Sequence, residues 1–139
     1  MDDLSLEISA PGTAELGVLF ERLGVFNRAA VPEWGKQTLS VTLRDPGGAL
    51  VAGGYAELLL GLAEFRAVWV EEARRRTGVG RSVMGALEAA ARERGAERAF
   101  LYTYSFQARG FYETLGYRLL ASLPFPRGGV ERLYFVRDL

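Results

Sequence analysis

The sequence predicts an α/β (α+β) fold with one central sheet, mixed but mostly antiparallel, and helices on both of its faces. Segments in which apolar and polar residues alternate recur along the chain and indicate strands. Between them lie segments with helical spacing or with capping and stop residues. Some strands follow one another as hairpins and others flank a helix, which predicts a mixed sheet. The expected order is β-α-β-β-β-α-β-α-β-β, with about seven strands in a single domain over residues 1–139.

The N-terminal part is expected to hold one strand and one helix. Residues 4–8 alternate between apolar and polar side chains, which predicts a short strand. A Pro-Gly pair ends this strand, and Thr13 is expected to cap a helix that runs to about Asn27. Residues 30–37 are expected to form a loop.

A hairpin and a fourth strand come next. Residues 39–43 alternate and predict a strand, and the turn sequence Asp45-Pro46-Gly47-Gly48 leads back into a strand over residues 49–59. The fourth strand is expected over residues 64–70. Apolar residues at helical spacing then predict a helix over residues 78–94. The remaining expected elements are a strand over 99–103, a short helix over 106–115, a strand over 117–123, a loop over 124–129 and a strand over 133–136.

The composition excludes several kinds of chemistry. The chain has no Cys and no His, so it has no thiolate nucleophile, no disulfide, no Cys/His zinc site and no Ser-His-Asp triad. No metal is expected. Acid–base chemistry would depend on carboxylates, Tyr, Lys or water polarised by Arg.

The charge balance is neutral, with 17 basic and 17 acidic residues. This balance argues against a general partner among nucleic acids or membrane surfaces. The acidic start Met1-Asp2-Asp3 lacks the layout of a signal peptide, and the longest apolar stretch, Leu58–Ala63, is far short of the roughly 20 residues of a membrane span. We therefore expect a cytoplasmic protein.

The most informative segment is Arg74–Ser82, which combines four arginines with Gly78 and Gly80 between a predicted strand and a predicted helix. Glycines let an anion approach the main chain, and the unpaired N–H groups of a helix N-terminus attract it. The segment therefore predicts a phosphate site, with an ordinary turn beside solvated charges as the alternative. The spacing fits neither a P-loop nor a dinucleotide fingerprint.

The spacing Arg75-x-x-Gly78-x-Gly80 resembles the pyrophosphate loop of the GCN5-related N-acetyltransferase (GNAT) superfamily. A second cluster, Ser105–Tyr117, resembles the second motif of that family. Its matching residues are Ala108, Phe111, Tyr112, Gly116 and Tyr117, and Ser105 stands where Asn is common. The Phe106-Gln107-Ala108 motif and the Pro-containing segment near the end of the sequence resemble one bacterial branch of this family.

This resemblance implies the GNAT fold and the transfer of an acetyl group from acetyl-CoA to a primary amine in a ternary complex. It implies that the fourth and fifth strands part to admit the pantetheine arm and that the loop holds the pyrophosphate. The residues it assigns to acetyl-CoA are Val68, Trp69, Val70, Arg75, Arg76, Thr77, Gly78, Val79, Gly80, Arg81, Ser82, Ser105, Ala108, Arg109, Phe111 and Tyr112.

For catalysis, the resemblance assigns the general acid to Tyr112, whose hydroxyl can serve the departing thiolate. Counting back eleven residues from Arg75, as in histone-type relatives, assigns the base to Glu64, with Glu57 or water as alternatives. The amine acceptor, a homodimer and acyl groups other than acetyl stay open. The competing functions are a non-catalytic acyl-CoA-binding regulatory module and a pure interaction domain.

Overall fold

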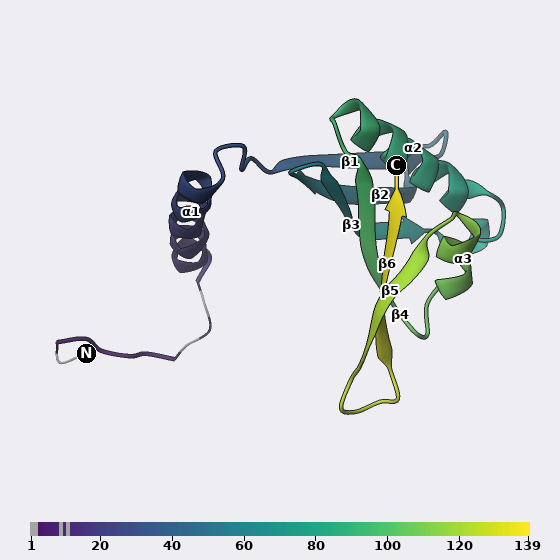
Figure 1. Cartoon of the computed structure of the whole chain (residues 1–139). Coiled ribbons are helices and arrows are strands. Elements are labelled where there is room, and N and C mark those ends of the chain that lie inside the picture. Colours follow the sequence, from purple (N-terminus) through teal and green to yellow (C-terminus); the bar gives the residue numbers. More distant parts are fainter. Residues whose placement is uncertain (1–2, 9, 11) are drawn as a thin grey trace. The chain divides into compact units, whose positions relative to one another are not determined.

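The computed structural model describes residues 3–8, 10 and 12–139, and the elements follow one another as shown in Figure 1. The chain forms two compact units, Met1–Gly35 and Lys36–Leu139. The second unit contains the whole sheet and the remaining helices. The described residues do not include Met1, Asp2 and Pro11. The first two belong to the acidic start of the sequence, and Pro11 belongs to the Pro-Gly pair before the first helix.

The first unit contains the helix α1 (Thr13–Ala30). The expected cap at Thr13 is wrong, because Thr13 is the first helical residue and Gly12 occupies the cap position without a side-chain hydrogen bond. Residues 4–8 do not form the expected strand. An alternating pattern specifies only which side chains share a face, and a strand also needs a neighbour for its backbone groups.

The second unit contains a six-stranded sheet, one strand fewer than expected because residues 4–8 form none. Its order is β1-β2-β3-β4-β6-β5, and only β3 and β4 pair in parallel. The strands are β1 (Gln37–Arg44), β2 (Leu50–Leu59), β3 (Leu62–Val70), β4 (Arg98–Tyr104), β5 (Arg118–Pro124) and β6 (Glu131–Asp138).

The turn between β1 and β2 confirms the predicted hairpin. Asp45 accepts a hydrogen bond from Gly48 N–H at 2.9 Å, and its carboxylate accepts another from Ala49 N–H at 2.9 Å. Gly48 has φ +88°, a conformation that favours glycine.

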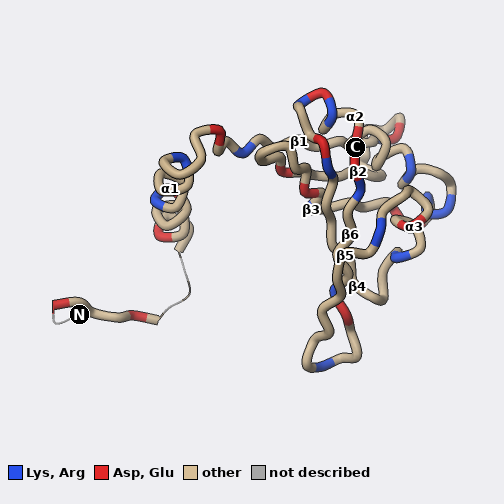
Figure 2. Tube along the Cα trace, viewed as in Figure 1, with Lys and Arg blue, Asp and Glu red and all other residues tan. Residues whose placement is uncertain are grey.

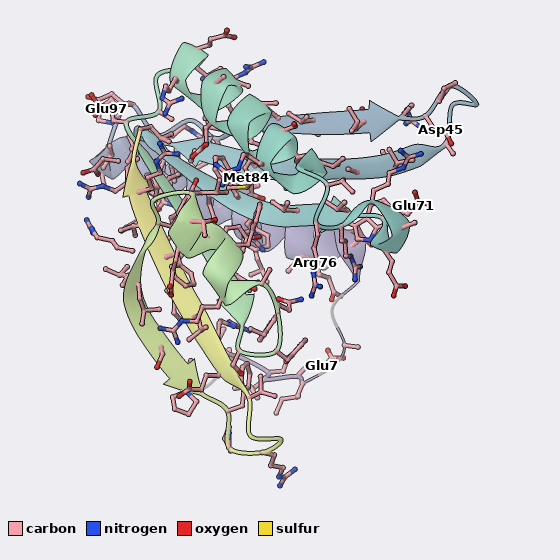
Figure 3. All side chains as sticks on the ribbon, turned by 90° about the vertical axis from the view of Figure 1, so that its right-hand side faces the viewer. Glu7, Asp45, Glu71, Arg76, Met84 and Glu97 are labelled. Atoms are coloured by element: carbon pink, nitrogen blue, oxygen red, sulfur yellow. The ribbon has the colours of Figure 1, made fainter. Side chains whose placement is uncertain are left out.

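The helix α2 (Val79–Glu93) covers one face of the sheet and contacts β1, β2 and β3 (Figure 1). Met84, labelled in Figure 3, and Leu87 are fully buried in this layer. Gly54 on β2 allows the close approach, because a Cβ atom there would lie 2.5 Å from Leu87 Cδ1. The layer therefore depends on a glycine in the middle of a strand.

The short helix α3 (Arg109–Thr114) is smaller than the helix expected over residues 106–115. Residues 105–107 form a turn and a bend instead, because Gln107 turns back on the end of β4. Its side-chain oxygen accepts hydrogen bonds from Thr103 Oγ1 at 2.9 Å and from Tyr104 N–H at 3.2 Å. The glycines predicted to end the helices, Gly95 and Gly116, have φ +89° and +91°.

Candidate functional site

The site is built where β3 and β4 part. These two strands pair only over Leu62–Glu64 and Arg98–Phe100, so the backbone edges beyond these pairs face one another without a ladder. A cleft of about 910 Å³ opens between the parted ends. Its lining residues are Val68, Trp69, Val70, Arg75, Arg76, Gly78, Gly80, Arg81, Thr103, Phe106, Gln107, Ala108, Phe111 and Tyr112.

One wall of the cleft is the C-terminal part of β3. Val68 and Val70 pack against the core, and Trp69 between them is 47% exposed. The main chain of this segment has no ladder partner on the side of β4, because the pairing of the two strands ends at Glu64. Arg75 Nε donates a hydrogen bond to Val70 O at 3.1 Å, which ties the following loop to the end of the strand.

The loop delivers the N-terminus of α2 to the cleft. Gly78 caps the helix in the left-handed conformation with φ +88°, and no side chain bonds to the cap. The first hydrogen bond at this end runs from Ser82 N–H to Gly78 O, so the N–H groups before Ser82 have no partner in the helix. Such donors, together with the helix dipole, favour an anion.

Arginines surround this helix end. Arg74–Arg76 follow the acidic Glu71 and Glu72 in the segment between β3 and α2, and Figure 2 colours such basic and acidic residues blue and red along the chain. Arg74 Nε forms an ion pair with Glu71 Oε2 at 3.1 Å. Within the described unit Lys36–Leu139, Arg76 and Arg81 line the cleft and form no ion pair. Arg76, labelled in Figure 3, also has φ +63°, a strained conformation for a residue with a side chain.

The glycine at position 80 leaves little free space around it. A Cβ atom on Gly80 would lie 3.2 Å from Phe111 Cζ on α3 and 3.7 Å from Val70 Cγ2 on β3. The predicted pattern thus has two different physical causes. Gly78 supplies a backbone conformation, and Gly80 supplies space where three elements meet.

The opposite wall comes from the end of β4 and from α3. Thr103, Phe106 and Gln107 line the cleft although the sequence analysis did not assign them. Phe106 is 71% exposed and lies within the turn that Gln107 stabilises. The Phe-Gln-Ala motif could have been used to assign Phe106 and Gln107 to the site. The buried Thr103 offered none, because its pattern is that of any inward-facing strand residue.

Tyr112 reaches the cleft from α3. Its ring packs against Phe111, Tyr117 and Phe135, with centroid distances of 5.1, 6.1 and 6.2 Å. In the part of the chain that the structure describes, its hydroxyl has no hydrogen-bond partner. Burial raises the pKa of Tyr112 above its usual value, so the neutral hydroxyl is favoured and remains available as a donor.

Five residues assigned to acetyl-CoA lie outside the cleft lining: Thr77, Val79, Ser82, Ser105 and Arg109. The side chains of Ser105 and Arg109 bond to other residues, as those of Thr77 and Ser82 do. Ser105 Oγ accepts a hydrogen bond from Glu131 N–H at 3.0 Å and so joins the end of β4 to β6. Arg109 Nε forms an ion pair with Glu113 Oε1 at 2.9 Å along α3. Both contacts hold the wall of the cleft in place.

The two carboxylates assigned as candidate bases face each other across β2 and β3. Glu57 and Glu64 are paired in the ladder, and neither lines the cleft. Arg66 Nη1 lies 3.8 Å from Glu57 and 3.7 Å from Glu64. Lys36, through a hydrogen bond and its charge, lowers the pKa of Glu57 below the usual value.

A buried carboxylate joins α2 to the segment after α3 and to β6. Glu88 on α2 is 5% exposed and accepts a hydrogen bond from Tyr117 Oη at 2.9 Å. Its carboxylate also pairs with Arg137 Nη1 of β6 at 2.5 Å. Burial and the Glu88 carboxylate raise the pKa of Tyr117 far above its usual value. This network connects the helix that carries the loop to the strands behind Tyr112.

Across residues 3–8, 10 and 12–139, no group of three or more acidic side chains lies close enough to hold a metal ion. Among the helices that these residues form, none has the length and apolar character of a membrane span.

The chain is similar to two curated bacterial proteins. It is 38% identical over 73 residues to Blasticidin-S acetyltransferase of Streptomyces morookaense, a match that covers 52% of this chain and 54% of the relative. It is 33% identical over 88 residues to the uncharacterized N-acetyltransferase YjcF of Bacillus subtilis (strain 168), covering 63% and 62%. The chain thus spans less than two thirds of the length of these relatives.

Among solved structures, the chain shares its fold with an acetyltransferase from Bacillus cereus ATCC 14579. The TM-score is 0.84 at 21% sequence identity, and the match covers 96% of this chain and 98% of the other. The family model described as "Acetyltransferase (GNAT) domain" matches residues 36–119, which is more than half of the chain and includes the cleft walls. The chain therefore belongs to the GNAT acetyltransferase family.

Proposed function

We propose that this protein is an N-acetyltransferase that moves an acetyl group from acetyl-CoA to a primary amine of a small molecule or peptide, by direct attack in a ternary complex. The observation that carries the proposal is the cleft, in which two parted strands lead to an open helix N-terminus flanked by unpaired arginines. A pantetheine arm needs backbone partners, and a pyrophosphate needs N–H donors and positive charge. The cleft offers both.

The acetyl-CoA contacts follow from this fit. The open main chain at Val68 and Val70 pairs with the amides of the pantetheine arm as an added strand would. The N–H groups between Arg76 and Arg81 donate to the pyrophosphate, and the two arginine side chains add charge-assisted bonds. The relative named Blasticidin-S acetyltransferase supports a small-molecule acceptor.

In the proposed reaction, the neutral amine attacks the thioester carbon, a C–N bond forms and the C–S bond breaks. Tyr112 donates its hydroxyl hydrogen to the departing sulfur and regains a proton from water. Its raised pKa keeps the phenol protonated at neutral pH, so the hydroxyl can donate a hydrogen bond to the sulfur as negative charge develops on it. The amine gives up one proton and the sulfur gains one, so the step is balanced.

We assign the removal of the amine proton to Glu64 acting through water. Glu64 forms the last β3–β4 pair, with Phe100, so it lies where the two strands begin to part. Water must complete the path, because the side chain does not line the cleft. Glu57 is the weaker candidate, since its lowered pKa makes it a poorer proton acceptor.

Incubation with acetyl-CoA and a panel of primary amines, followed by mass spectrometry, tests the proposal. We expect one or more acetylated amines together with free CoA. Binding of acetyl-CoA in a calorimeter without turnover of any amine would favour the non-catalytic acyl-CoA-binding module. Failure to bind acetyl-CoA would favour a pure interaction domain. Replacing acetyl-CoA with longer acyl-CoA donors measures the acyl preference in the same assay.

A further inference from the structure

An arginine on β6 is held among aromatic rings beside the cleft. Arg132 is the ladder partner of Tyr104, at the end of β4 where the strands have parted. Neighbouring residues of these strands, Leu101, Thr103 and Leu133, are buried on the α2 side of the sheet. By strand alternation, Arg132 and Tyr104 therefore belong to the opposite face.

The rings hold the guanidinium by its faces. Arg132 Cζ lies 4.6 Å from the ring centroid of Tyr102, 5.4 Å from that of Tyr104 and 5.4 Å from that of Phe125. One nitrogen, Nη2, donates to Tyr104 Oη at 3.2 Å. The hydroxyls of Tyr134 and Tyr104 raise the pKa of Arg132, so the group stays cationic.

The guanidinium of Arg132 is suited to bind a carboxylate, and no residue of Lys36–Leu139 supplies one. Within the described unit Lys36–Leu139, no carboxylate lies within 4.0 Å of it, whereas Arg98 on β4 and Arg137 on β6 each have one. Its Nε atom is buried and has no hydrogen-bond partner there. Ring contacts occupy the faces of the guanidinium, and Nη2 gives one hydrogen to Tyr104 Oη. The remaining Nη hydrogens lie at the edge of the guanidinium and can bind an incoming group.

A continuous row of rings joins this arginine to the cleft. The ring of Tyr104 stacks on that of Phe106, with centroids 5.6 Å apart and planes 7° apart. Phe106 in turn lines the cleft. A molecule whose amine lies in the cleft can therefore extend over these rings and reach Arg132.

We propose that Arg132 and the rings of Tyr102, Tyr104, Phe106 and Phe125 form the acceptor subsite, and that the acceptor is an amine with an aromatic body and a carboxylate. The carboxylate pairs with the Nη donors of Arg132, and the aromatic body lies on the rings. This inference rests on the proposed acetyl transfer and names the class of its acceptor.

Matched acceptors that differ only in the carboxylate test the inference. The pairs are 4-(aminomethyl)benzoate with benzylamine and phenylalanine with phenethylamine, each assayed for kcat/KM with saturating acetyl-CoA. We expect the wild type to prefer an acid over its neutral partner by about 10-fold or more. In Arg132→Met the preference for the acid over its neutral partner should fall to about twofold or less.

The control is Arg118→Met, which removes an exposed arginine from the neighbouring strand β5, outside the ring cluster. It should keep the preference. Tyr104→Phe, which removes only the hydroxyl that holds Nη2, should reduce the preference partially. Thermal unfolding of each variant shows whether it is folded.

Three outcomes overturn the assignment of Arg132 while acetyl-CoA binding stays intact. One is a wild type that acetylates no acid of the panel or prefers the neutral amines. Another is an equal loss for both members of a pair in Arg132→Met. The third is a changed oligomeric state in that variant, which would make this face an interface between copies. A wild type that does not bind acetyl-CoA at all would overturn the proposed function as well.

Discussion

The two walls of the cleft are built in different ways. The wall formed by β3, the following loop and the start of α2 presents main-chain groups, and its glycines are required by conformation or by space. The wall formed by the end of β4 and by α3 presents aromatic side chains, and the rings beside it are positioned by the pairing of β4 with the distant strand β6. A main-chain site suits a ligand that every relative shares, and a side-chain site suits a ligand that differs between relatives.

The largest expected effect concerns Glu88, which connects the two walls. Replacing Glu88 by Ala should lower the free energy of unfolding by about 3 kcal/mol, because Arg137 and the Tyr117 hydroxyl lose their buried partner. Urea denaturation measures this change. The control is Glu93→Ala, an exposed position on the same helix, which should change stability by less than about 0.5 kcal/mol. Equal effects at both positions would contradict the connecting role.

The second prediction breaks the main-chain wall. Gly80→Val should weaken acetyl-CoA binding by about 100-fold, because the added side chain meets the Phe111 ring and displaces it, together with α3, from its place at the cleft. Gly85→Val is the matched control on α2, since a Cβ atom at Gly85 has no neighbour within 4 Å. Calorimetry compares the two dissociation constants. Similar affinities would show that the packing at Gly80 does not shape the site.

The third prediction tests the side-chain wall at Tyr112. Tyr112→Phe should lower kcat by about 30-fold through the lost hydrogen bond to the departing sulfur, while acetyl-CoA affinity changes little. Tyr55→Phe, a hydroxyl deletion that affects a bond to Glu57, is the control. Because the pKa of Tyr112 is raised, its ionisation should cause no loss of activity below about pH 10. Unchanged kcat in the variant would remove Tyr112 from the mechanism.

The smallest expected effect separates the two candidate bases. Glu64→Gln should lower kcat/KM about 10-fold at pH 7, and the loss should shrink at higher pH, where more of the amine is already neutral. Glu57→Gln should stay within about twofold of wild type, because its lowered pKa makes Glu57 a weak proton acceptor. A pH profile of each variant is the measurement. The reverse order of effects would assign the base to Glu57.

The difference between the walls also explains what the sequence could reveal. Gly78 and Gly80 are readable because a main-chain site leaves its requirements at fixed spacing along one short segment. The sequence likewise predicted correctly that Gly95 and Gly116 end helices, because each needs only a local positive φ. The partners of Arg132 were not readable, because Tyr104 and Arg132 meet through a ladder between residues 28 positions apart.

Two errors have a related cause. Residues 4–8 have the alternation of a strand but lack a neighbour in a ladder, and alternation alone does not supply one. The helix expected from residue 106 begins only at Arg109, because the Gln107 side chain bonds to the end of β4. Side-chain bonds of this kind compete with helix formation and leave no periodic signal.

The parting of β3 and β4 has a consequence for the protein before it meets any acceptor. Unpaired strand edges are sites where polypeptides associate wrongly, and a ligand that completes them removes that hazard. A donor that binds only the folded chain also adds stability by mass action, about 2.7 kcal/mol when it is present at 100 times its dissociation constant. The concentration of acetyl-CoA would then govern the fraction of the protein that stays folded as well as the rate of the reaction.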